Sequence, residues 1–361
     1  MQGMRGVLPL LTLVCIHTAS AARGAQLVSQ LVDQLSVGED NAAPLPVVLW
    51  HGMGDSCCAS YSMGAIKALI EEKLPGTYVH SIATGDGAMS DVWSSYFGNV
   101  NDQVAKVCLE LRNTPQLARG YNAVGFSQGG QFLRAVVERC QHLGPRARTL
   151  VTLGAQHQGV ANVPGCNTVP SNLTAHTRAA AAGSIKAAQG GAKAVGSGAC
   201  ETMQTLLGKG AYLPWVRDHI VQAQYFKDPA RMDEYLRSNI FLPDINNEKA
   251  ARNAQYARNL ASLEQLVLYR FANDTTVVPR DSAWFALFDG TAVVALEDQP
   301  IYKEDWIGLR ALDAAGKLVF AEAPGAHMQF TLDWFESDIL WPYLSGDKPS
   351  SVAAAKASAA A

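Results

Sequence analysis

The residues with the clearest chemical meaning form a Gly-x-Ser-x-Gly motif at 125–129, with Ser127 at its centre. An apolar run of strand-forming residues, 121–126, leads into the motif, and a helix-like segment, 131–142, follows it. This context is typical of a nucleophile elbow, a sharp turn that presents a serine hydroxyl at the top of a sheet. Both glycines leave room where the strand and the helix approach each other closely. The sequence therefore predicts that Ser127 is a catalytic nucleophile; the alternative is an ordinary glycine-rich turn.

A serine hydroxyl needs a base to remove its proton, and after such an elbow the partners follow in the order Ser, Asp or Glu, His. His327 fits this order, because it lies in a loop directly after the strand-like residues 318–321. His157 is the alternative base, but the only acid between Ser127 and His157 is Glu138, inside a helix. We predict that His327 is the base and that His157 is a wall of the substrate pocket.

The acid that orients the imidazole is expected after the preceding strand. Asp274 follows the strand-like residues 266–271, and we predict that it has this role. Asp281 is the second choice, and Asp244 lies in a region that reads as helical.

A tetrahedral oxyanion needs backbone N–H groups aimed at its negative charge. One donor is expected from Gln128, the residue after the nucleophile, and another from the loop after an early strand. That loop is His-Gly-Met-Gly-Asp at 51–55, where two glycines let the backbone come close, so we predict that Met53 supplies the second N–H.

Strand-like and helix-like segments alternate around these motifs. This alternation predicts an α/β fold with a mostly parallel sheet and helices on both faces. The expected strands are 44–50, 77–82, 121–126, 149–153, 266–271 and 318–321, and expected helices include 62–73, 131–142 and 333–344.

The organisation predicts one catalytic domain over 44–345, interrupted by a helical cap from about 160 to 263. Within the cap, 175–199 is an Ala/Gly-rich insertion, and the tail 346–361 is expected to be disordered.

The N-terminus is typical of a secretory signal peptide. Arg5 precedes an apolar run at 7–16, and small residues follow at 19–22, so we predict a signal peptide over 1–21. A buried N-terminal helix is the alternative. The run is too short for a bilayer, and no other run approaches ~18 apolar residues, so we expect no transmembrane segment.

Cysteines and sequons fit an oxidising compartment. One of the seven cysteines lies in the signal peptide, and the even number that remains suggests three disulfides, although six cysteines allow about 15 connectivities. No Cys-x-x-Cys spacing favours a metal site. Sequons place candidate glycosylation sites at Asn172 and Asn273.

The composition is that of a globular protein. Of 361 residues, 48% are hydrophobic and 17% are charged. With 29 basic and 32 acidic residues the formal charge is −3, so the chain has no basic surplus for a nucleic-acid backbone, and we expect no nucleic-acid partner.

Several blocks of the chain resemble the lysosomal palmitoyl-protein thioesterases. The blocks are WHGMGDSCC at 50–58, YNAVGFSQGGQFLRA at 121–135, QHQG at 156–159, DIN at 244–246 and ND at 273–274. The resemblance implies an α/β-hydrolase fold and the removal of long fatty acyl groups from cysteines, without a cofactor or metal. Its implied substrates are S-acylated proteins or peptides and acyl thioesters such as palmitoyl-CoA, and its implied location is the lysosome or vacuole, with secretion as an alternative.

The resemblance also implies roles for individual residues. The triad falls on Ser127, Asp274 and His327, and the oxyanion donors fall on Met53 and Gln128. The acyl or substrate pocket includes Trp50, His51, Gln156 and His157. The implied disulfides are Cys57–Cys58, Cys108–Cys140 and Cys166–Cys200.

Two other functions use the same motifs or the same fold. An oxygen-ester lipase or carboxylesterase has the same triad, and a non-catalytic lipid-binding protein is the alternative outside enzymes.

For a long acyl chain we expect a binding groove between the core and the cap. Its candidate lining is Leu206, Leu207, Leu213, Trp215, Val216, Ile220, Val221, Tyr225 and Phe226.

Overall fold

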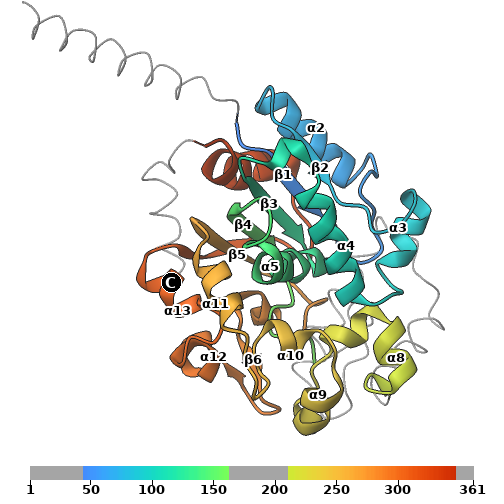
Figure 1. Ribbon diagram of the computed structural model, residues 1–361, viewed down its shortest axis with the longest axis vertical. Coiled ribbons are helices and arrows are strands. Elements are labelled where there is room, and N and C mark those ends of the chain that lie inside the picture. The colour runs from blue at the N-terminus through green and yellow to red at the C-terminus, as the bar shows by residue number, and fades with distance from the viewer. Residues whose placement is uncertain (1–43, 162–209, 347–361) are drawn as a thin grey trace, which may run out of the picture. The chain divides into compact units, whose positions relative to one another are not determined.

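A six-stranded parallel sheet is the centre of the fold. The computed structural model describes residues 44–161 and 210–346 (Figure 1). Neighbouring strands pair in parallel in the order β2-β1-β3-β4-β5-β8. These strands are β1 (Val47–Trp50), β2 (Val79–Ser81), β3 (Tyr121–Phe126), β4 (Ala147–Leu153), β5 (Gln265–Phe271) and β8 (Leu318–Ala323).

Helices supply the crossovers that parallel strands require. They are α2 (Met63–Lys73), α3 (Ala88–Ser94), α4 (Val100–Arg112), α5 (Gln128–Cys140), α8 (Pro214–His219), α9 (Met232–Ser238), α10 (Leu242–Ile245), α11 (Ala254–Ala261), α12 (Pro300–Lys303), α13 (Leu309–Ala314) and α14 (Leu332–Phe335). Short 3₁₀ segments are η1 (Pro115–Leu117), η3 (Val221–Tyr225), η4 (Pro229–Arg231), η5 (Arg280–Trp284) and η6 (Leu296–Asp298), and a π-helical segment is η7 (Glu336–Leu344).

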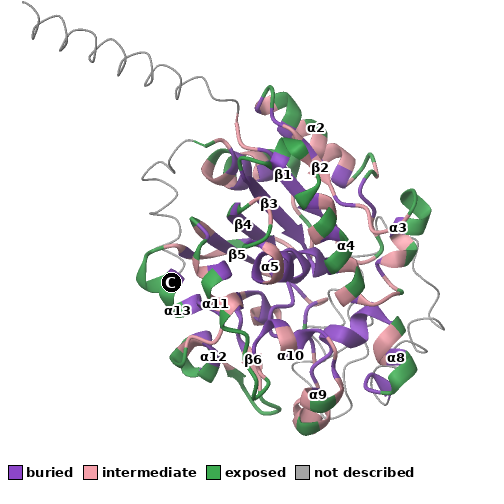
Figure 2. Ribbon diagram, in the orientation of Figure 1, coloured by how far each residue is buried: buried purple, intermediate pink, exposed green. Residues whose placement is uncertain are grey.

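The two faces of the sheet are both buried, as Figure 2 shows for the strands. Along β1, Val48 and Trp50 belong to one apolar cluster, which packs against α4, α5, α11 and α13. Val47 and Leu49 belong to a second cluster, which includes residues of α2, α14 and η7. Successive strand residues face opposite sides, so a fully apolar strand is what a sheet covered on both faces needs. The predicted α/β class, with a mostly parallel sheet and helices on both faces, is confirmed.

Each of the six predicted strands forms, with ends shifted by a few residues. The predicted helix 333–344 instead divides into α14 and η7, where Pro342 lies inside the π-helical segment and has no N–H to donate. The sequence did not predict α3, α12, α13 or the small hairpin of β6 (Leu287–Phe288) and β7 (Val293–Val294).

Helices α8 to α11 lie between β4 and β5 in the chain, where the cap was expected, and the domain boundaries stay predictions. The signal peptide 1–21, the insertion 175–199 and nearly all of the tail 346–361 lie outside the described residues. Among the helices that are described, none is long and apolar enough to cross a bilayer.

Two of the three implied disulfides are present. Cys57 is bonded to Cys58, and Cys108 of α4 is bonded to Cys140 at the end of α5. Both cysteines of the third pair, Cys166 and Cys200, lie outside the described residues.

Candidate active site

Ser127 occupies a strained turn between β3 and α5. Its backbone has φ 52° and ψ −124°, a combination that residues other than glycine rarely adopt. A Cβ on Gly125 would come within 2.5 Å of the Gly130 Cα, and a Cβ on Gly129 within 2.2 Å of the Trp50 carbonyl oxygen. The glycines of the motif therefore let β3, α5 and β1 pack closely enough to hold the serine in this conformation.

The structure brings the three candidate catalytic side chains into one hydrogen-bonded chain. His327 Nε2 is 2.9 Å from Ser127 Oγ, and His327 Nδ1 is 2.6 Å from Asp274 Oδ2. A carboxylate only accepts hydrogen bonds, so Nδ1 carries the proton and Nε2 is left to accept from the serine hydroxyl. This is the arrangement that removes a proton from a nucleophilic serine.

Asp274 is held in place by the backbone that follows it. Its Oδ1 accepts hydrogen bonds from Thr276 N–H at 2.8 Å and Val277 N–H at 3.0 Å, while its side chain is 1% exposed. These bonds leave Oδ2 directed at the imidazole.

The alternative acid and base have other partners. Asp281 forms an ion pair with Arg270. His157 is fully buried, contacts Thr152 Oγ1 at 3.0 Å and stacks on the ring of Phe285. Burial and the charge of Arg134 hold the pKa of His157 well below its usual value.

Both candidate oxyanion donors lie beside Ser127. Gln128 is the first residue of α5, where an N–H has no partner within the helix. A Cβ on Gly52 would be 2.9 Å from the Ser127 Cβ, which brings the loop 51–55 against the serine. Met53 lines the same cavity as Ser127 and His327.

The family is decided by comparison with known proteins. The family model described as "Palmitoyl protein thioesterase" matches residues 46–327. The chain belongs to this family. Palmitoyl-protein thioesterase 1 of Caenorhabditis elegans is 41% identical over 302 residues, which are 83% of this chain and 91% of that protein. Palmitoyl-protein thioesterase 3 of Dictyostelium discoideum is 31% identical over 307 residues, which are 84% of this chain and 91% of that protein.

A more distant relative has a name that includes a compartment. It is the "Lysosomal thioesterase PPT2 homolog" of Drosophila melanogaster, 28% identical over 308 residues, which are 83% of this chain and 91% of that protein. The thioesterase family therefore extends over most of this chain and includes the whole candidate triad.

A cavity of about 840 Å³ opens at the nucleophile of this family member. Most of its apolar side chains come from α2 and from the segment after β8 rather than from the predicted cap. They are Met63 and Ile66 of α2, and Met328, Phe330 and Leu332 after β8.

The expected groove between core and cap is therefore not supported by the described residues. Among the candidate lining residues that the structure describes, only Tyr225 reaches the cavity. Four others are buried in the main apolar cluster, namely Val216, Ile220, Val221 and Phe226. Leu213 and Trp215 are exposed, and Leu206 and Leu207 lie outside the described residues. Met63 and Ile66 of the expected helix 62–73 line the cavity, although they were not among the candidate lining residues.

The structure places the four pocket residues implied by the resemblance outside the lining of this cavity. Trp50, His51, Gln156 and His157 are each at most 2% exposed, and none of them lines this cavity. Gln156 instead donates from Nε2 to Ser127 Oγ at 3.1 Å and to the Gly154 carbonyl oxygen. Trp50 packs edge-on against Phe132. Sequence reasoning missed the contact of Gln156 with the nucleophile because nothing local in QHQG indicates it.

The glycosylation predictions stay open. Asn273 is exposed and directly precedes Asp274, so a glycan there would be attached beside the acid of the triad. Asn172 lies outside the described residues.

Proposed function

We propose that this protein hydrolyses long-chain acyl thioesters of cysteine through an acyl-serine intermediate, with Ser127, His327 and Asp274 as the triad. The observation that carries the proposal is the chain of hydrogen bonds from Ser127 Oγ through His327 to Asp274 at the mouth of an apolar cavity. The membership of the chain in a thioesterase family supports the thioester as the scissile bond.

Acylation begins when His327 Nε2 accepts the Ser127 proton and Oγ attacks the thioester carbonyl carbon. The N–H groups of Met53 and Gln128 stabilise the tetrahedral oxyanion, and Asp274 stabilises the imidazolium. The carbon–sulfur bond then breaks, the cysteine thiolate takes the proton from His327, and the acyl group stays on Ser127.

In deacylation, water takes the place of the serine hydroxyl as the group that gives its proton to His327. His327 removes a proton from water, the hydroxide attacks the acyl carbon, and Ser127 Oγ leaves with the proton that His327 holds. The products are the free fatty acid and the regenerated serine. Each of these steps uses groups of this chain and water alone.

The cavity supplies the reason for a long-chain substrate. Each methylene of an acyl chain that is buried against its apolar side chains contributes about 0.8 kcal/mol to the binding free energy. S-acylated proteins or peptides and acyl thioesters such as palmitoyl-CoA present such a chain next to the reacting carbonyl. The "lysosomal" names of relatives and the predicted signal peptide support delivery through the secretory pathway to the lysosome or vacuole.

The test is hydrolysis of a palmitoylated cysteine peptide by the wild-type protein and by Ser127→Ala. The wild type should release palmitate and react with a fluorophosphonate probe, whereas the variant should do neither while it keeps its melting temperature. A matched palmitoyl oxygen ester separates thioesterase from lipase: equal or faster turnover of the oxygen ester would contradict the thioester assignment. A wild-type protein that neither reacts with the probe nor hydrolyses either substrate would be a lipid-binding protein instead.

A further inference from the structure

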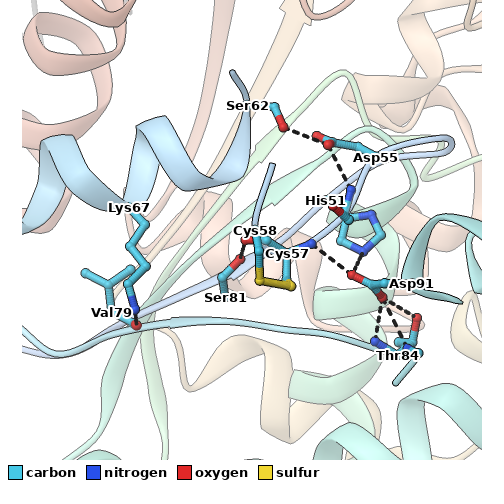
Figure 3. The surroundings of a disulfide bond; sticks show 12 residues. His51, Asp55, Cys57, Cys58, Ser62, Lys67, Val79, Ser81, Thr84 and Asp91 are labelled. Atoms are coloured by element: carbon cyan, nitrogen blue, oxygen red, sulfur yellow. Dashed lines mark hydrogen bonds and ion pairs between the residues drawn. A yellow bond between two sulfur atoms is a disulfide. The ribbon is translucent and has the colours of Figure 1, made fainter. Parts of the chain in front are cut away.

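A buried histidine and a buried aspartate lie directly behind the loop of Met53. His51 Nε2 is 3.0 Å from Asp91 Oδ2, and the two side chains are 1% and 0% exposed. Figure 3 shows this pair between the loop that carries Asp55 and the segment around Thr84. Neither residue lines the cavity at Ser127. Two charges removed from water are costly unless their hydrogen bonds are complete, so the pair needs a reason to be there.

The partners of His51 require a proton on both ring nitrogens. Nδ1 is 2.9 Å from the carbonyl oxygen of Gly52, which accepts only. Nε2 faces the Asp91 carboxylate, which also accepts only. Burial works against the charged ring, but the Asp91 carboxylate, 3.0 Å from Nε2, outweighs it and raises the pKa of His51. The geometry and the charges agree on an imidazolium.

Asp91 is anchored on its other side by backbone N–H groups. Its Oδ2 also accepts from Cys57 N–H at 2.8 Å, and its Oδ1 accepts from Thr84 N–H at 2.7 Å. Burial raises the pKa of Asp91, but the charge of His51 and the N–H groups of Cys57 and Thr84 lower it further than burial raises it. The carboxylate is therefore a fixed point to which His51 is attached.

The hydrogen bond from His51 fixes one side of a peptide plane. The only cis peptide bond in the described part of the chain is Val278–Pro279, so the bond from Gly52 to Met53 is trans. In a trans peptide the C=O and the N–H point in opposite directions. Holding the Gly52 carbonyl toward His51 therefore sends the Met53 N–H away from His51.

The neighbouring N–H groups of this loop are already used. Gly54 N–H donates to Ser95 Oγ at 2.8 Å, and Asp55 N–H is directed at the Gly52 carbonyl oxygen. Ser56 N–H donates to the Asp55 side chain. For Met53 N–H the structure gives no acceptor among the described residues. It is the donor in this run that is left for a substrate.

We propose that His51 and Asp91 are positioning residues, which hold the Gly52–Met53 peptide so that the Met53 N–H is preset for the oxyanion. This inference rests on the proposed function, because it assigns a role within the same reaction. The positive charge of His51 lies on the carbonyl side of that peptide and increases its polarity, which favours negative charge at the N–H side. The pair therefore stabilises the transition state, whereas binding of the acyl chain in the ground state depends on the cavity.

The test is His51→Gln, compared with two kinds of ligand. A hexadecyl trifluoromethyl ketone adds to Ser127 as a tetrahedral alkoxide and needs the oxyanion donors, whereas KM for the palmitoyl thioester depends mainly on the chain. Removal of one oxyanion donor costs about 10²–10³ in kcat, and misplacing it should raise the inhibition constant and lower kcat by at least about 10-fold. KM should change by less than about threefold. Asp91→Asn should shift the same two constants in the same direction.

His80→Gln is the matched control. His80 Nε2 is 2.7 Å from Glu110 Oε1, so this variant also removes a histidine from a carboxylate partner, but His80 does not line the cavity at Ser127. It should leave the inhibition constant, kcat and KM as in wild type. Inhibition constants and KM do not depend on the fraction of folded protein, so partial misfolding of a variant does not mimic the expected result.

Two failures are distinguishable. If wild type hydrolyses the thioester and Ser127→Ala does not, but His51→Gln and Asp91→Asn keep the ratio of inhibition constant to KM within about threefold of wild type, the positioning role is wrong and the proposed function stands. If the wild type has no thioesterase activity, the proposed function is wrong, and the inference that depends on it falls with it.

Discussion

Asp274 and Asp281 both follow β5, yet their carboxylates have different partners. Asp274 contacts His327, whereas Asp281 contacts Arg270. Asp274→Asn should therefore leave the imidazole in the wrong tautomer and lower kcat by up to about 10⁴-fold. Asp281→Asn removes an ion pair that does not touch the triad, so kcat should stay within about threefold of wild type. The measurement is kcat for a palmitoyl thioester, with the melting temperature of each variant.

Wild-type turnover by Asp274→Asn together with an inactive, folded Asp281→Asn would contradict this assignment.

The elbow, the late histidine and the acid could be predicted from the sequence because each follows a recognisable strand. The His51–Asp91 pair was not, because α3 was not predicted and an ion pair between residues far apart in sequence leaves no local pattern. For the same reason the contact of Gln156 with Ser127 appears only in three dimensions.

Helix α2 contributes a wall of the cavity, and this can be tested on two of its alanines. Ala65 lines the cavity, whereas Ala68 lies on the exposed face of the same helix. Ala65→Phe should occupy the space that we assign to the acyl chain. Each methylene displaced costs about 0.8 kcal/mol, close to fourfold in kcat/KM, so palmitoyl should lose at least about 10-fold relative to butyryl.

The control is Ala68→Phe, which adds the same ring to the same helix and should leave the ratio of palmitoyl to butyryl kcat/KM unchanged. The two variants are compared over a thioester series from butyryl to stearoyl, below the micelle threshold. An unchanged chain-length profile in Ala65→Phe would place the chain elsewhere.

The course of the strands was predictable because each is a short apolar run that ends in glycine or a polar turn, and β1 is an example. The walls of the cavity were not, because Ile66 and Phe330 meet only when α2 and the segment after β8 pack on the same face of the sheet. Periodicity identifies a buried helix face, but it does not distinguish a face packed on the core from a face that lines a cavity.

Arg134 connects the nucleophile helix to segments far along the chain. From α5 it donates to Glu138 Oε1 at 2.8 Å, to the Ile245 carbonyl oxygen at 3.0 Å and to Asn246 Oδ1 at 2.7 Å. Both Arg134 and Glu138 are fully buried, and Glu138 Oε2 has no partner among the described residues. Burial raises the pKa of Glu138 to about 7, although Arg134 opposes the shift.

This pKa links the stability of the whole molecule to pH. Between the unfolded value near 4.5 and about 7, the folded state holds a proton on Glu138 that the unfolded state has released. The contribution of Glu138 to the free energy of unfolding should therefore be most favourable below pH 4.5 and fall as pH rises to about 7. The whole contribution is up to about 3 kcal/mol, and its sign suits an acidic compartment.

Glu138→Gln isolates this effect, since glutamine has nearly the shape of the protonated acid and does not titrate. Urea unfolding of wild type and variant from pH 4.5 to 7.5 should give a difference in unfolding free energy that grows with pH in favour of the variant. Glu264→Gln is the control, because Arg148 and Glu264 are also 2.8 Å apart but exposed, and its difference from wild type should stay small at every pH. A Glu138→Gln difference that is constant from pH 4.5 to 7.5 would mean that Glu138 stays ionised beside Arg134, and the predicted link between its pKa and stability would be wrong.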